Sequence, residues 1–123
     1  MIKSRNIDPE AGRWSEPLKL ASSVTASFAF KNPTAHTIFI DKIIVNVTTA
    51  AASKTLYAGA SASATATNAT NELLNGASLV SSQVLSGVGE TTIAKGSYLV
   101  GTLNATDATL DAYAYVHFKE LIK

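Results

Sequence analysis

Apolar and polar residues alternate with a period of two along much of the chain, which is the pattern of half-buried β-strands. The clearest run, Thr109 to Phe118, places small and aliphatic side chains on one face and polar and aromatic ones on the other. The first face holds Leu110, Ala112, Ala114, Val116 and Phe118, and the second holds Asp111, Tyr113, Tyr115, His117 and Lys119. A similar run begins at Val24 and ends at the Asn32-Pro33-Thr34 turn.

Shorter strands are predicted near Lys54 to Gly59 and Ser97 to Leu103. No segment has the spacing of a convincing amphipathic helix. The fold expected from the residues is therefore all-β, with six to eight antiparallel strands in a β-sandwich.

The run from Thr37 to Thr49 changes phase part-way along. Ile38 and Ile40 share one phase, whereas Ile43, Val45 and Val47 share the opposite one. Because a slip of one residue turns every later side chain to the other face of a sheet, the pattern predicts a bulge or bend near Asp41-Lys42.

The middle of the chain carries weaker signals. Ala60 to Asn71 contains only Ala, Ser, Thr and Asn, which favours a surface loop or a weak edge strand. Asn75-Gly76 predicts a tight turn with positive φ. Val84-Leu85 forms a short apolar island before Gly87-Val88-Gly89.

The first 22 residues differ from the rest, with seven charges, two of the three prolines and no sustained periodicity. We expect an extended N-terminal arm at 1–22 and a β-sandwich domain at 23–123. Trp14 is the large anchor of this arm. It either packs as a lid over the domain's own core or inserts into a neighbouring subunit.

Composition limits the classes of function. A chain of 123 residues has room for one domain, and its formal charge of +1 gives no bulk attraction for nucleic acid or an anionic membrane. The absence of cysteine excludes disulfides, thiolate metal sites and cysteine nucleophiles. No stretch has the apolar length of a membrane span, and no secretory signal is expected at the start of the chain.

The sequence offers little for catalysis. His36 and His117 are the only histidines, and neither lies in a spaced ligand pair or a known catalytic motif. We expect no catalytic, metal or cofactor-binding residue, and no enzyme. His117, beside Tyr115 on the polar face of the last strand, is better suited to a cross-strand or subunit contact.

The positive signal concerns the surface. Only Lys54, Glu72, Glu90 and Lys95 are charged between Ile43 and Thr106. Ala and Thr can be covered by another protein at low desolvation cost, which favours contacts in an oligomer or lattice. The candidate interface residues are Trp14, Tyr57, Tyr113, Tyr115 and His117. The alternative is that Thr and Tyr are abundant on the outer strands only because they suit strands.

A resemblance to a known family runs from about Phe28 to Phe118. The segments that carry it are Phe30-Lys31-Asn32-Pro33, Ile43 to Ala50, Leu56 to Ala60, Glu72 to Leu79, Gly96 to Thr102 and Ala112 to Phe118. In this order they resemble small tailed-bacteriophage virion proteins with a jelly-roll-like β-sandwich, which decorate capsids or form the base of head fibres. The loop Ala60 to Asn71 departs from that family by its plainer composition.

The resemblance implies a structural role in the virion, after synthesis in the host cytoplasm, and commonly a trimer that contacts the major capsid protein or other virion proteins. It implies no catalytic residue. The leading expectation is a protein that decorates or stabilises the capsid, with the arm and Trp14 as the anchor. The alternatives are a tail, portal-vertex or fibre protein, and a carbohydrate-binding module that uses Tyr57, Tyr113 and Tyr115 as stacking platforms.

Overall fold

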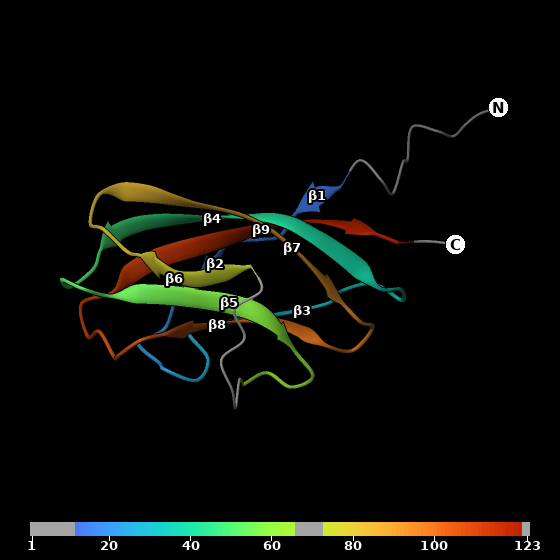
Figure 1. The fold of residues 1–123 in the computed structure, drawn as a ribbon, viewed down its shortest axis with the longest axis horizontal. Coiled ribbons are helices and arrows are strands. Elements are labelled where there is room, and N and C mark those ends of the chain that lie inside the picture. Colours follow the sequence, from blue (N-terminus) through green and yellow to red (C-terminus); the bar gives the residue numbers. More distant parts are fainter. Residues whose placement is uncertain (1–11, 66–72, 122–123) are drawn as a thin grey trace.

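Nine strand segments form two antiparallel sheets that pack face to face in the computed structural model (Figure 1), which describes residues 12–65 and 73–121. The strands are β1 (Arg13–Trp14), β2 (Leu18–Lys19), β3 (Phe28–Lys31), β4 (Ile38–Thr49), β5 (Thr55–Ser61), β6 (Leu74–Ser78), β7 (Gln83–Ile93), β8 (Tyr98–Leu103) and β9 (Asp111–Glu120). The predicted antiparallel β-sandwich is confirmed. Within the described ranges there is no helix with the length and apolar character needed to cross a bilayer.

The strand order is that of a jelly roll. One sheet has the order β1-β9-β4-β7, with β2 also paired to β9, and the other has the order β3-β8-β5-β6. β1 and β2 lie one after the other along the same edge of β9, so the two sheets hold eight strand positions. The chain crosses between the sheets repeatedly, as in the double-sheet jelly roll.

Residues 13–20 of the predicted arm lie along the edge of β9. Arg13 and Trp14 pair with Phe118 and His117, and β2 pairs farther down the same strand. Leu20 is buried in the core, at 2% exposed. This part of the chain therefore contributes both an edge of the first sheet and a core side chain.

The predicted bulge in the long strand is confirmed. The pairing of β4 with both neighbours shifts register between Ile40 and Lys42. Asp41 is an extra residue relative to β9, and β7 sets two residues, Gly89 and Glu90, opposite it. Because the bulge absorbs the change of phase, Ile40 and Ile43 both face the core and are fully buried.

The turn predicted at Asn75-Gly76 is wrong. Both residues lie inside β6, and the ladder with β5 shifts register between Leu56 and Tyr57. Gly76 has φ +78° and is the extra residue of a bulge in β6. The dipeptide does supply the positive φ that its composition indicates, but a bulge uses it in place of a hairpin turn.

Two further strand boundaries differ from the pattern. The strand predicted from Val24 starts at Phe28, because the Ser23 hydroxyl accepts hydrogen bonds from the backbone N–H groups of Thr25 and Ala26 and closes a turn. The apolar island at Val84-Leu85 belongs to the eleven-residue strand β7. Gly and Ser residues within β7 hide its alternation.

Candidate interaction surface

The outer surface of the β1-β9-β4-β7 sheet gathers four of the five predicted interface residues. Alternation along β9 buries Ala112, Ala114 and Val116, so the side chains of Tyr113, Tyr115 and His117 stand on the other side of the strand. β1 pairs Trp14 directly with His117. We call Trp14, Tyr113, Tyr115 and His117 the aromatic face.

Trp14 is held on this face by contacts with two side chains. Its ring meets the His117 imidazole edge-on, with 5.0 Å between centroids and 62° between planes. The Lys42 ammonium lies 5.7 Å from the centroid of the Trp14 ring. Trp14 is still 44% exposed, so a large part of the indole is available to a partner.

The bulge in β4 positions His117. Asp41 Oδ1 lies 2.8 Å from His117 Nδ1, and that contact fixes the orientation of the imidazole beneath Trp14. Burial alone would raise the pKa of Asp41, but the hydrogen bond and charge of His117, its own backbone N–H and the charge of Lys42 lower the pKa below its usual value. The bulge thus places an ionised carboxylate at the base of the aromatic face.

A second cation lies over the other end of the face. Lys19 Nζ is 5.0 Å from the centroid of the Tyr113 ring and 3.3 Å from Asp111 Oδ1. Both partners of this ion pair are half exposed, so it contributes little to the free energy of unfolding. Its effect is to keep the Lys19 stem over Tyr113, which is 39% exposed.

Sequence reasoning missed three contributors to the same surface. Lys42 and Ile44 come from β4, where Ile44 pairs with Tyr115, and Val84 comes from the edge strand β7 with 64% of its surface exposed. The sequence signal was the two-residue alternation of the strand, since a residue next to a buried position of a strand must face outward.

Tyr57 is separated from the other four predicted residues. It lies in β5 of the second sheet and is half-buried. An added Cβ at Gly76 would lie 3.4 Å from the Tyr57 hydroxyl oxygen, which shows how closely the phenol lies over the β6 bulge. No single flat partner can therefore contact Tyr57 together with Tyr113 and Tyr115.

Asp107 is a buried carboxylate that ties loops together. Its Oδ2 accepts a hydrogen bond of 2.8 Å from the Ala51 N–H, and its Oδ1 accepts hydrogen bonds from the N–H and hydroxyl of Thr109. Its own N–H donates to the hydroxyl of Ser22. Burial raises the pKa of Asp107, but the Ala51 and Thr109 donors outweigh it and lower the pKa below its usual value. This geometry serves the fold, since the hydrogen bonds join Asp107 to Ser22 and to the loop at Ala51.

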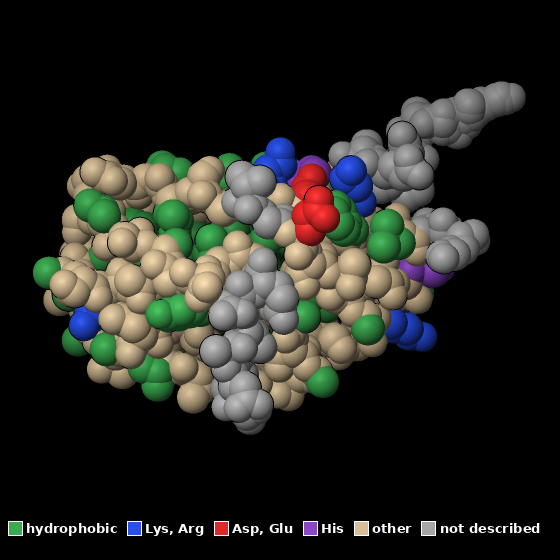
Figure 2. Space-filling model, viewed as in Figure 1, with side chains coloured by type: hydrophobic (Ala, Val, Ile, Leu, Met, Phe, Trp, Pro, Cys, Tyr) green, Lys and Arg blue, Asp and Glu red, His purple; other side chains and the backbone are tan. Residues whose placement is uncertain are grey.

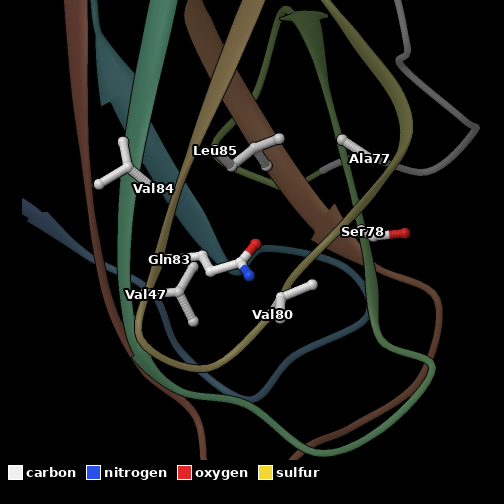
Figure 3. Close-up of a pocket in the computed structure, with 7 residues that line it drawn as sticks. All are labelled: Val47, Ala77, Ser78, Val80, Gln83, Val84 and Leu85. Atoms are coloured by element: carbon white, nitrogen blue, oxygen red, sulfur yellow. The ribbon is translucent and has the colours of Figure 1, made fainter.

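Two of the pockets in the described part of the chain are lined largely by apolar side chains. One of about 320 Å³ opens between β6 and β7 and is lined mainly by aliphatic side chains, including Val47, Val80 and Leu85 (Figure 3). The other, of about 480 Å³, lies between the arm and β3 and includes Phe30 and Phe118. In residues 12–65 and 73–121, no three His, Asp or Glu side chains come together as a metal site would require.

Charged side chains are sparse over much of the surface. In the view of Figure 2 charged side chains are few: Asp and Glu side chains lie near the upper edge, and Lys and Arg side chains lie near the upper edge and at the two ends. Such a surface costs little to desolvate when it is covered.

The sequence matches no protein-family model, and comparison with curated proteins and with solved structures found no similar protein.

Proposed function

We propose that the protein is a structural assembly subunit, and specifically a virion protein of a tailed bacteriophage that decorates or stabilises the capsid. The observation that carries the proposal is the aromatic face. Trp14 and Tyr113 stand exposed on a sheet whose other side is the hydrophobic core, and each ring contacts neighbouring side chains that orient it. Rigid aromatic side chains lose little conformational entropy on binding, which makes them effective anchors.

In this proposal the action is mechanical and involves no chemical step. The partners are the major capsid protein or other virion proteins, together with further copies of the chain in a trimer. Each copy would bury a contact of about 1,200–2,000 Å² on the particle and stabilise the shell by mass action. The resemblance of the sequence to capsid-decoration and head-fibre-base proteins, together with the jelly-roll strand order, supports the virion setting.

The test is co-sedimentation of the purified protein with phage particles that lack it. Trp14→Ala together with Tyr113→Ala should weaken binding by at least about 30-fold, the loss expected from an interfacial hot spot of about 2 kcal/mol. Val24→Ala is the matched control, because Val24 is 47% exposed but lies in the loop before β3. Unchanged binding by a folded double variant would exclude the aromatic face as the anchor.

Copy number separates decoration from a position at the tail, portal vertex or fibre. Closed symmetry leads us to expect hundreds of copies on a decorated head, but on the order of three to a few tens of copies at a tail, portal-vertex or fibre position. Quantitative gel densitometry of purified particles measures this number directly.

A carbohydrate-binding module is the second candidate, favoured by the exposed rings of Trp14 and Tyr113 on one sheet face. Aromatic rings can stack on sugars, but Tyr57 cannot join this platform because it lies on the other sheet. Calorimetric titration with host-surface polysaccharide would distinguish this candidate: saccharide binding that is lost in the Trp14→Ala variant would favour it over assembly.

A further inference from the structure

β7 forms an edge of the first sheet. It pairs with β4 on one side, and no strand of the described residues pairs with it on the other. The residues Gln83–Val88 pair regularly with β4, whereas the ladder is bulged where Gly89 and Glu90 face Asp41. The first half of β7 is therefore an edge with no neighbouring strand on its outer side in the described residues, although its Gln83 N–H already donates to the Val80 carbonyl.

This half of β7 lacks the features that protect edge strands from pairing. Gln83–Val88 contains no charged residue and no proline, and the bulge begins only after it. An exposed edge without such features offers free backbone N–H and C=O groups to another strand.

An apolar patch lies beside the same edge. Val84 is 64% exposed and Val80 is 44% exposed, and both line the 320 Å³ cavity between β6 and β7 (Figure 3). Leu85 and Val47 continue the lining towards the core. The open backbone edge and the apolar cavity thus occupy one site.

We propose that this site binds a second copy of the chain through antiparallel pairing of Gln83–Val88 with the same segment of that copy. An uncharged strand is complementary to itself, since a two-fold axis brings no like charges face to face. With the axis at Leu85, outward side chains meet outward side chains, and Val84 of each copy lies opposite Ser86 of the other. The part of each apolar patch at Val84 is then covered.

The inference goes beyond the proposed function, because it uses β7 and not the aromatic face. Pairing through β7 joins the first sheets of two copies into one continuous sheet, so the two aromatic faces point the same way and can bind a surface together. A two-fold contact gives a dimer, or a dimer of trimers where a separate three-fold contact exists. In both cases the number of copies is even.

The experiment measures molar mass by light scattering after size-exclusion chromatography. The wild-type chain should have an even multiple of the 12.8 kDa chain mass. Val84→Lys together with Ser86→Lys should halve that mass, because the axis places these exposed positions close to their equivalents and the lysines repel. Ala29→Lys, on the exposed side of the edge strand β3 at the opposite side of the sandwich, should leave the mass unchanged.

A charge swap tests the pairing itself. Mixing the double-lysine variant with a variant carrying Val84→Glu and Ser86→Glu should restore the wild-type mass, since opposite charges then face each other across the axis. A wild-type monomer at every concentration, an unchanged mass in the double-lysine variant, or a failure of the mixture to reassociate would each overturn self-pairing. Loss of particle binding by a double-lysine variant of a monomeric wild type would also overturn it and assign the edge to a strand of another protein.

Failure of this inference is distinguishable from failure of the proposed function. The Trp14 and Tyr113 substitutions leave β7 intact and should leave the molar mass unchanged, so their loss of particle binding concerns the proposed function alone. Self-pairing is judged from the molar mass of the β7 variants and not from their particle binding, because Val84 lies on the same outer surface as Tyr113.

Discussion

The backbone approaches a core side chain closely at Gly101, and Gly101→Ala measures how tightly the sandwich is packed there. Gly101 in β8 pairs with Phe28 in β3. A Cβ added at Gly101 would lie 2.1 Å from Phe28 Cε2 and 2.4 Å from Cδ2, whereas carbon atoms in ordinary contact are about 3.5–4.0 Å apart. The ring would have to move by more than 1 Å on that comparison, and Phe28 is only 4% exposed.

The expected cost follows from two opposing effects. Overpacking of a filled core costs about 3 kcal/mol at the upper end of its usual range. Replacing a strand glycine by alanine returns about 0.5–1 kcal/mol through the lower entropy of the unfolded chain. The net loss is about 2 kcal/mol, or about 8 °C in Tm for a domain of this size.

Urea denaturation followed by circular dichroism measures this loss, and a second variant tests its cause. Phe28→Leu alone should destabilise by leaving a void, but Gly101→Ala combined with Phe28→Leu should lose less than the sum of the two single variants, because the smaller side chain makes room for the new methyl group. A Gly101→Ala variant as stable as the wild type, or strictly additive losses in the double variant, would refute the reasoning.

Three further changes test the loops and bulges. Asp107→Asn should cost about 2 kcal/mol at neutral pH, because its amide must turn an N–H towards a donor. Because folding lowers the pKa of Asp107, its stabilisation is complete above the ordinary value of 3.8 and is lost as the pH falls through the folded value. In thermal melts at a series of pH values, the Tm of the variant should therefore fall less steeply with acidification than that of the wild type. An equally steep fall would contradict this. Gly76→Ala, at φ +78°, should cost about 1 kcal/mol in urea denaturation, and no loss would mean that the bulge does not need a left-handed residue. Asn32→Ala should cost about 2 kcal/mol, since its Nδ2 donates to the carbonyls of His36 and Ile93; a stability within error of wild type would show that water replaces it.

Much of the fold could be predicted from side-chain phase. The change of phase between Ile40 and Ile43 indicated a bulge, and the alternation in β9 indicated which residues face outward. Such signals are readable because burial forces a period of two on any strand with one face in the core.

Other features could not be read because several structures share one local signal. Asn75-Gly76 meets the requirement of a hairpin turn and of a bulge alike, and only the pairing with β5 decides between them. The alternating pattern of β7 was obscured in the sequence because its inward position 87 is a glycine, which faces Leu74 and Ile43 where a larger side chain would not fit. Tyr57 was grouped with Tyr113 because the sequence does not say which sheet each strand joins.

Asp41 has a partner in neither neighbouring ladder, since both pairings pass directly from Ile40 to Lys42. Strand pairing therefore does not require an aspartate at this position, while the surrounding strand fixes its place beneath His117. A substitution at this residue can change the charge and hydrogen bonding of the outer surface without changing the packing of the core. Recognition and folding can therefore change independently at this position.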